Sequence, residues 1–328
     1  MKIPPLLLDQ NENPYGPSPK ATLAAFRALK ELSRYPRDVR SLEEKIASTL
    51  AVVPGAVIST SGSDRVIELT LRALSRSANR ILVPMPSFQM YELLSSALGL
   101  NATFVPIYME GYGGLIEEAR GGDLIMLASP NSPDGRILGT NELEELAQTS
   151  SCLVIDEAYG EYARTSFAGL TSKIPNLVVI KTFSKAFALA SLRVGYLVAS
   201  EDVARRVRPL TGPYEVSTVG VEACKAALDD PSYYERVIAL TQENRMEMRK
   251  ALEGLRGIRV YPSHANYLLL QLLNGDASMT YEELKSRNIL IRNCRGWRGL
   301  EGEFLRVSVG TKSEITLFLT AFKEVLGA

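Results

Sequence analysis

Short runs of apolar residues without strict alternation recur along the first two thirds of the chain. They lie at 80–85, 123–128, 152–158, 176–181 and 193–199. Continuous apolar runs of this length are typical of strands that are covered on both faces. We therefore expect these five segments to be buried strands.

The segments between the runs carry helical patterns. In 63–78, Val66, Leu69 and Ala73 fall on one face of a helix, and 140–150 is a second helical segment. Strands that alternate with helices predict an α/β fold, with a mostly parallel central sheet and helices on both faces.

The pattern changes after residue 212, where helices and shorter strands follow. We expect helices at 216–229, 231–255, 281–287 and 313–326, and strands at 258–261, 266–272, 288–293 and 303–309. The first 25 residues are rich in Pro and Asn and resemble an arm without a core of its own. The predicted organisation is an N-terminal arm (1–25), a large domain (26–212) and a small α+β domain (213–328) that packs with the arm.

Composition narrows the class of protein. The chain has 328 residues, 46% of them apolar, which is enough for a substantial core. Lys and Arg number 37, as do Asp and Glu, so we expect neither a nucleic acid nor a membrane as partner. Cys152, Cys224 and Cys294 lie too far apart for a disulfide framework or a metal motif. With no signal peptide and no membrane-length apolar run, a cytoplasmic protein is predicted.

The single histidine, His264, limits the chemistry further. A metal site built from several histidines is impossible, and a Ser-His-Asp triad would have to use this residue. His264 lies in a turn before an apolar strand, where a solvated or locally bonded histidine is the usual case. We expect no metal site.

Two polar motifs follow predicted strands, at the edge where open α/β sheets bind ligands. The small-residue turn "STSGSD" (59–64) opens a helix, and free N–H groups there suit an anion such as phosphate. The turn "ASPNSPDGR" (128–136) surrounds Asn131, which could equally bond its own backbone in an ordinary loop.

Two further motifs carry charge. Asp156 ends the apolar run "LVID", where a carboxylate needs a cation or several donors; a structural ion pair would also satisfy it. Lys185 lies among apolar and small residues, a setting that favours a neutral amine able to form a Schiff base. Arg193, eight residues later, offers a guanidinium fork for a phosphate. Pyridoxal phosphate (PLP) needs a phosphate cradle, a reactive amine and a carboxylate for its ring nitrogen.

These motifs also stand in a familiar order. Over nearly its whole length the chain resembles a class I/II (fold-type I) PLP-dependent aminotransferase. Asn131, Asp156, Tyr159, Lys185, Arg193 and Arg306 carry that resemblance. Within the class it is most similar to histidinol-phosphate aminotransferases, on the stretches "LDQNENPYGPSP" (8–19), "RYPRD" (34–38), "PSFQMY" (86–91), "SKAFALASLRVGY" (184–196), "PSHANYLLL" (262–270) and "LRVSVGT" (305–311).

The resemblance implies roles for these residues. Lys185 would bind the cofactor covalently and then move a proton, and Asp156 would pair with the ring nitrogen. Asn131 and Tyr159 would bond the ring oxygen, with Phe88 stacked on the ring or packed in the core. Ser63, Asp64, Thr182 and Arg193 would hold the phosphate, joined by Tyr35 from the partner subunit of a homodimer. Arg306 would bind the substrate carboxylate.

The substrate is less closely defined by the sequence. Tyr15 and Arg292 match positions at the phosphate end of histidinol phosphate, although Arg292 could instead pair with a nearby Glu. The chain departs from the family at Ser132 and Asp134, where Asn and Thr are usual, and at Ala190 and Ser191. The resemblance implies transamination between an amino acid and a 2-oxo acid, as in histidine biosynthesis with 2-oxoglutarate. An aromatic aminotransferase and an amino-acid phosphate decarboxylase are the alternatives.

Overall fold

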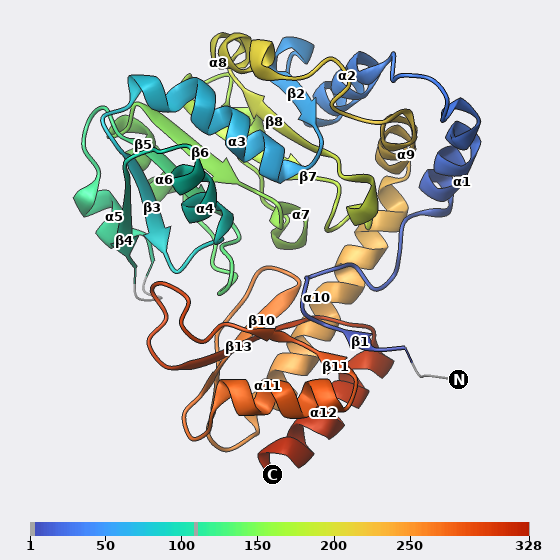
Figure 1. Ribbon diagram of the computed structural model, residues 1–328, viewed down its shortest axis with the longest axis vertical. Coiled ribbons are helices and arrows are strands. Elements are labelled where there is room, and N and C mark those ends of the chain that lie inside the picture. Colours follow the sequence, from blue (N-terminus) through green and yellow to red (C-terminus); the bar gives the residue numbers. More distant parts are fainter. Residues whose placement is uncertain (1–3, 108–110, 328) are drawn as a thin grey trace.

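The structure, a computed structural model, describes residues 4–107 and 111–327. Within these residues the strands form sheets of seven, four and two strands. Figure 1 shows the seven-stranded sheet in the upper part of the molecule and the four-stranded sheet in the lower part. The long helix α10 (Pro231–Glu253) connects the two parts. A helix of its 23 residues is about 35 Å long, which is enough to span both.

The upper sheet is almost entirely parallel. In spatial order its strands are β2 (Val57–Thr60), β8 (Gly195–Ala199), β7 (Leu177–Thr182), β6 (Cys152–Asp156), β5 (Leu124–Ala128), β3 (Ile81–Met85) and β4 (Ala102–Pro106). Only β8 runs against its neighbours β2 and β7 within this sheet. The α/β fold class predicted from the sequence is confirmed, and the reversal of β8 is an addition to it.

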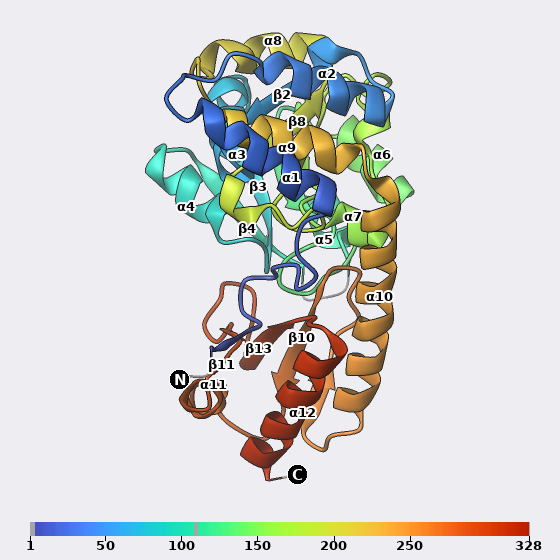
Figure 2. The same ribbon diagram turned by 90° about the vertical axis from the view of Figure 1, so that its right-hand side faces the viewer.

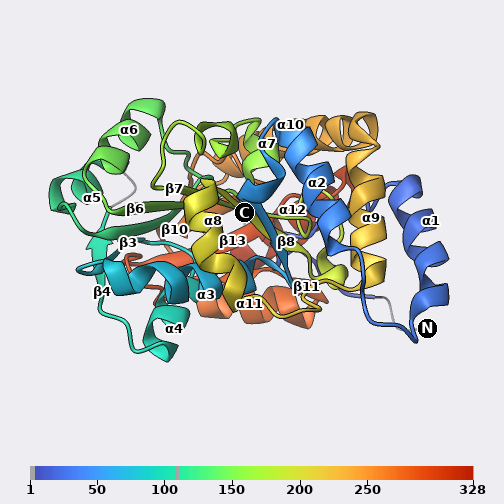
Figure 3. The same ribbon diagram turned by 90° about the horizontal axis from the view of Figure 1, so that it is seen from above.

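Helices cover both faces of this sheet, which explains why its strands are apolar throughout. In β6, Leu153 and Ile155 join the core under one set of helices, whereas Cys152 and Val154 face the other set. The first set is α2 (Val39–Leu50), α5 (Gly113–Glu118), α6 (Thr140–Gln148) and α9 (Thr218–Leu228). The second is α3 (Ser63–Leu74), α4 (Met90–Ala97) and α8 (Glu201–Val207). Figure 3 shows the sheet between these layers.

The lower sheet is antiparallel, in the order β12 (Arg292–Asn293), β13 (Glu303–Ser308), β10 (Tyr267–Leu272) and β9 (Ile258–Val260). Helices α11 (Ala277–Ser286) and α12 (Lys312–Leu326) pack on it. The sequence favoured Ser313 as the start of the last helix, but the N-cap is Thr311. Its hydroxyl accepts the N–H of Glu314, and the Glu314 carboxylate accepts the N–H of Thr311 in return.

The N-terminal arm, described from Pro4, lies on both parts of the molecule. Strand β1 (Leu6–Leu7) pairs in parallel with β11 (Ile289–Leu290) in the lower part. Leu8 is buried in the core of that part. Farther on, α1 (Pro19–Ala28) packs on α9 in the upper part, as Figures 1 and 2 show.

The division at residue 212 stays a prediction. Helix α9 follows that boundary, yet its buried residues Ala223 and Cys224 belong to the core of the upper sheet. No helix in the described residues has the length and apolar character needed to cross a membrane. The three cysteines are buried and unpaired.

Candidate active site

A cavity of about 360 Å³ opens at the carboxyl ends of the central strands of the upper sheet. Ala128 of β5, Asp156 of β6 and Thr182 of β7 contribute to its floor. The first turn of α3, the start of α4, the loops after β5 and β6, the β7–β8 loop and the N-terminal arm complete the wall. The lining residues from these segments are Gln10, Glu12, Ser63, Asp64, Phe88, Tyr91, Ser132, Ala158, Tyr159, Ser184, Lys185, Ala190, Ser191 and Arg193.

Asp156 forms the acidic end of this cavity and is 4% exposed. Its Oδ1 accepts the N–H of Ala158 at 2.9 Å, and its Oδ2 accepts the hydroxyl of Tyr91 at 2.9 Å. Burial, with smaller contributions from the charges of Asp64 and Glu157, raises the pKa of Asp156 to about 6 despite these two bonds. Within the described residues no cation lies at ion-pair distance. The site therefore has room for a cationic ligand atom.

Lys185 lies in the loop between the antiparallel strands β7 and β8. Its Nζ donates to the carbonyl oxygen of Gln10 at 2.7 Å and lies 5.7 Å from the centre of the Tyr159 ring. The side chain is only partly buried, so the dry setting expected from the sequence is not found. The reason is that Lys185 points into an open cavity rather than into the core.

The antiparallel pairing explains the spacing of eight between the two cations. Thr182 and Gly195 are register partners, so Lys185 and Arg193 lie in one loop at the same end of the sheet. The sequence predicted Arg193 at the start of the strand. In the structure it instead follows the 3₁₀ turn Ala190–Leu192 and has a left-handed backbone, with φ 51°.

The first turn of α3 forms a close-fitting cradle beside this loop. Gly62 precedes α3 with φ +87°, a conformation that favours glycine. A Cβ on Gly195 would lie 2.4 Å from the backbone nitrogen of Ser63, so strand β8 and the helix start are in direct contact. The N–H groups of the first turn are available to an anion because the helix itself leaves them without partners.

Arg193 extends over the cradle. Its Nη2 pairs with Oδ2 of Asp64 at 3.1 Å, and its Nη1 donates to Oγ of Ser184 at 3.4 Å. Thr182 lies below, and its Oγ1 accepts the N–H of Ser184 at 3.1 Å. A guanidinium, two hydroxyls and a helix N-terminus thus surround one point, which is a suitable arrangement for a phosphate.

Tyr159 stands between the cavity and the N-terminal arm. Its hydroxyl accepts the amide of Asn11 at 2.9 Å, and its ring meets that of Tyr267 edge to face, with centres 5.0 Å apart. Phe88 lines the cavity and meets Tyr91 in the same manner, with ring centres 5.6 Å apart.

Asn131 makes its hydrogen bonds within the turn, and its expected contact with the cofactor ring stays a prediction. Asn131 is fully buried but does not line the cavity. Its Nδ2 donates to the Pro86 carbonyl oxygen and to Asp134, each at 3.0 Å, and its Oδ1 accepts the hydroxyl of Ser87 at 3.1 Å. The amide therefore holds the turn, and the adjacent Ser132 reaches the cavity wall instead.

Arg306 of β13 reaches the site from the lower sheet and is 6% exposed. Its Nη1 donates to Oγ of Ser132 at 3.0 Å and its Nη2 to the carbonyl oxygen of Asp9 at 2.8 Å, while its buried Nε has no partner in the described residues. Arg292 is its register partner on β12. Both guanidinium carbons lie 6.0 Å from the centre of the Trp297 ring.

Two expected residues lie away from the cavity. Tyr35 is 72% exposed and stacks on Tyr214, with ring centres 4.4 Å apart. Tyr15 accepts the amide of Asn244 at 2.8 Å, beside the start of α12, and burial raises its pKa. Neither residue lines the cavity, and the substrate role expected of Tyr15 stays a prediction.

Sequence reasoning missed several members of the site. Tyr91 follows Phe88 by three residues in "PSFQMY", a spacing that could have placed both on one helical face. Gln10 and Asn11 belong to the arm, and only the fold brings them to Lys185 and Tyr159.

Comparison with known proteins identifies the family. The family described as "Aminotransferase class I and II" matches residues 3–322, nearly the whole chain. The chain belongs to this family. Its members use PLP, and this chain is a PLP-dependent aminotransferase.

Individual relatives and structures agree with this assignment. The aminotransferase is 34% identical to a histidinol-phosphate aminotransferase of Symbiobacterium thermophilum, over 98% of this chain and 90% of that protein. It superposes on the histidinol-phosphate aminotransferase of Clostridium acetobutylicum with a TM-score of 0.87 and 25% identity, covering 98% and 99% of the two chains. An L-threonine-O-3-phosphate decarboxylase of Porphyromonas gingivalis gives a TM-score of 0.85 and 26% identity, covering 98% of this chain and 99% of that chain.

The residues of the aminotransferase fit its cofactor. Asp156 is a buried carboxylate without a counter-ion among the described residues, and the first turn of α3 is packed so closely on Gly195 that a methyl group would disrupt it. Asp156 and this turn line one cavity together with Lys185. A ring cation, a phosphate and an aldehyde would each meet a matching group there.

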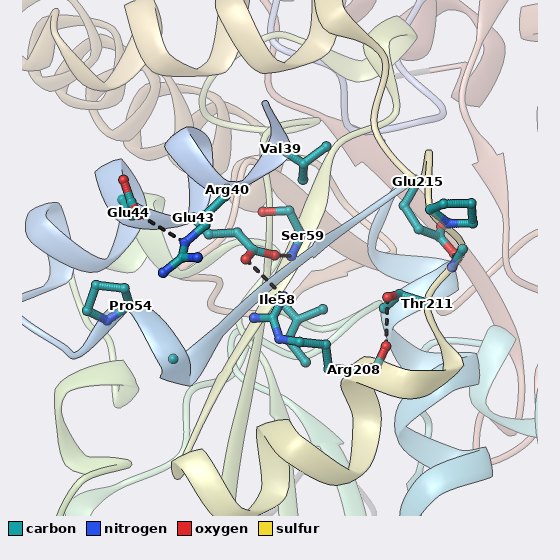
Figure 4. Close-up of a pocket in the computed structure, with 13 residues that line it drawn as sticks. Val39, Arg40, Glu43, Glu44, Pro54, Ile58, Ser59, Arg208, Thr211 and Glu215 are labelled. Atoms are coloured by element: carbon teal, nitrogen blue, oxygen red, sulfur yellow. Dashed lines mark hydrogen bonds and ion pairs between the residues drawn. The ribbon is translucent and has the colours of Figure 1, made fainter. Parts of the chain in front are cut away.

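A second cavity of about 380 Å³ lies elsewhere in the aminotransferase, at the free edge of β2 (Figure 4). Glu43 accepts the N–H of Ser59 at 2.9 Å, and Arg208 donates to the Val57 carbonyl oxygen at 2.6 Å. Glu43 and Arg208 also pair with each other at 3.1 Å. These side chains cap the edge of the sheet, which blocks pairing with another strand.

Proposed function

We propose that this aminotransferase transfers an amino group between histidinol phosphate and 2-oxoglutarate, in histidine biosynthesis. The observation that carries the proposal is the pair Arg292 and Arg306, directly opposite each other on β12 and β13. Like charges in that position repel and destabilise a sheet unless an anion lies between them. Neither arginine has a carboxylate partner in the described residues, and the anionic groups of the substrates, a carboxylate at Arg306 and a phosphate at Arg292, would neutralise the pair.

The geometry described above supports the following proposed roles for the site residues. PLP, when bound, supplies an aldehyde for the substrate amine and a protonated ring that withdraws electrons from the substrate Cα. Asp156 would pair with the ring nitrogen and favour its protonated form. Lys185 Nζ would hold the cofactor through its aldehyde and would accept the proton from the substrate Cα. The Tyr159 hydroxyl would donate to the ring oxygen.

The remaining residues bind and orient. Arg193, Thr182 and the N–H groups of Ser63 and Asp64 hold the cofactor phosphate, and Phe88 covers the ring face. We do not assign Asn131 to the cofactor, because its amide is already bonded within the turn. Ser132 is the wall residue at that point.

A homodimer with composite sites is part of the proposal. Leu23, Phe26, Leu29 and Leu32 are 45–72% exposed and follow one another at intervals of three residues along α1 and the turn after it. The Tyr35–Tyr214 pair is exposed as well. An apolar strip of this kind suits a second copy of the chain, in whose site Tyr35 would reach the phosphate.

Subunit mixing tests the dimer. Lys185→Ala and Tyr35→Ala are each expected to be poorly active alone. When the two are unfolded and refolded together, mixed dimers contain one site with neither substitution, so activity should return. If Tyr35 served its own subunit, every site of a mixed dimer would carry a defect and no activity would return.

Substrate profiling tests the reaction. We expect kcat/KM with glutamate to be highest for imidazole-acetol phosphate, and Arg292→Ala to lower it far more than for phenylpyruvate. A preference for phenylpyruvate by orders of magnitude would favour an aromatic aminotransferase instead. Release of CO₂ from a phosphorylated amino acid would favour the decarboxylase reaction. The cytoplasmic location stays a prediction.

A further inference from the structure

Tyr91 contacts the acidic end of the cavity from beneath. It belongs to the first turn of α4 and is fully buried. Its hydroxyl donates to Oδ2 of Asp156 at 2.9 Å, and Ala158 N–H is the one other donor to that carboxylate in the described residues. A hydrogen bond to a buried charged group is stronger than a neutral one, so its loss has a measurable effect.

The other charged groups around Asp156 work against its ionisation. Asp64 on α3 and Glu157, the next residue in the chain, both raise its pKa. Each is already paired with a cation of its own, Asp64 with Arg193 at 3.1 Å and Glu157 with Lys181 at 3.1 Å. Among the side chains that the structure describes around Asp156, the Tyr91 hydroxyl is the one that favours the carboxylate form.

The Tyr91 hydroxyl can donate its hydrogen bond to Asp156 at every pH at which the enzyme works. Burial raises its pKa well above the ordinary tyrosine value, and the negative charge of Asp156 raises it further; Tyr112 and Tyr159 act in the same direction. The hydroxyl therefore keeps its proton over the whole working range of the enzyme. The edge of the Tyr91 ring also supports Phe88, which lines the cavity.

We propose that Tyr91 is a positioning residue that keeps Asp156 ionised and fixes its Oδ2, leaving the carboxylate ready for a protonated ring nitrogen. The part of the inference that concerns the ring nitrogen rests on the proposed function. The coupling of Tyr91 to Asp156 is a property of the chain itself and can be measured without cofactor.

The test compares the cofactor-free enzyme with Tyr91→Phe, which keeps the ring and removes the hydroxyl. The Asp156 carboxyl carbon is followed by NMR as the pH is varied, with assignment by Asp156→Asn. We expect the titration midpoint to rise by about one pH unit, a tenfold change in the ionisation constant. An unchanged midpoint would overturn the inference.

Tyr112→Phe is the matched control. Tyr112 is also fully buried, and its hydroxyl donates at 2.8 Å to the carbonyl oxygen of Ala128, the register partner of Asp156. It has no bond to the carboxylate, so its removal should leave the midpoint in place; an equal rise in both variants would refute a specific role for Tyr91. Should Tyr91→Phe fail to fold, 3-fluorotyrosine at position 91 keeps the shape and donates more strongly, and the midpoint should fall.

Cofactor binding separates this inference from the proposed function. Affinity for PLP is measured by absorbance at a series of pH values. As the pH is lowered, the affinity should begin to fall at a higher pH in Tyr91→Phe than in the unsubstituted enzyme. If the enzyme binds PLP but the Asp156 midpoint does not move, the inference is wrong and the proposed function stands. If the midpoint moves but PLP does not bind near Asp156, the coupling stands and the proposed function is wrong.

Discussion

Replacing Asp156 by Asn should stabilise the cofactor-free protein while removing its function. Burial raises the pKa of Asp156 from 3.8 to about 6 in the folded chain. At about 1.36 kcal/mol for each pH unit, this difference corresponds to about 3 kcal/mol of stability lost at neutral pH. Asn removes the charge and keeps the shape. Its oxygen can still accept the N–H of Ala158, and its amide can donate to the Tyr91 oxygen.

The pH dependence has a definite sign. An acid whose pKa is raised by folding binds its proton more tightly in the folded state than in the unfolded state. Its contribution to stability is therefore complete below about pH 4 and is lost as the pH rises through about 6. The advantage of Asp156→Asn should be largest above pH 7 and should nearly vanish below pH 4.

Urea unfolding of the cofactor-free protein at several pH values, at one protein concentration, measures this difference. Asp123→Asn is the control, because Asp123 is 1% exposed but is paired with Arg80 and accepts the N–H of Arg120. Its substitution should destabilise the protein by about 1–3 kcal/mol at neutral pH. The reasoning about Asp156 is refuted if Asp156→Asn is less stable than the unsubstituted protein at pH 7.5, or if its advantage grows as the pH falls.

Three other substitutions test the surrounding structure. Gly195→Ala places a methyl group 2.4 Å from the nitrogen of Ser63, so PLP affinity, measured by titration, should fall sharply; retained affinity would show that the cradle can move. Lys181→Met leaves the buried carboxylate of Glu157 and the partly buried one of Glu161 without their cation and should cost about 3–5 kcal/mol in urea unfolding, whereas a loss below about 1 kcal/mol would contradict that account. Arg298→Ala breaks a pair with Glu92 whose arginine is 54% exposed, so thermal unfolding should change by less than about 1 kcal/mol.

The elements predicted best from the sequence were the strands that are buried on both faces. All five apolar runs became strands of the upper sheet, with ends within two residues of the expected positions. Strands β2 and β4 were not predicted. In β4 the first three residues are only partly buried, so an edge strand carries a weaker apolar signal than a central one.

Details that depend on turn geometry and long-range contacts were not available from the sequence. The turn around Asn131 decides that its amide points inward and that Ser132 faces the cavity, although the two residues are adjacent. The reversal of β8 leaves no signal in the sequence, because a strand that is buried on both faces has the same apolar pattern whether it runs parallel or antiparallel to its neighbours. Tyr15 was placed by resemblance alone, and only the fold brings it to Asn244, 229 residues farther along the chain.

The arm explains how two sheets can act on one substrate. Lys185 and Asp156 belong to the upper sheet, whereas Arg306 and Arg292 belong to the lower one. Three successive arm residues bond across this division: the Asp9 carbonyl to Arg306, the Gln10 carbonyl to Lys185 and the Asn11 amide to Tyr159. Each of these arm groups is neutral, so the arm fixes the cations without neutralising them. The positive charge of Arg306 is left for an anionic ligand, and a ligand that replaces the Gln10 bond to Lys185 costs the protein one hydrogen bond to a neutral carbonyl rather than an ion pair.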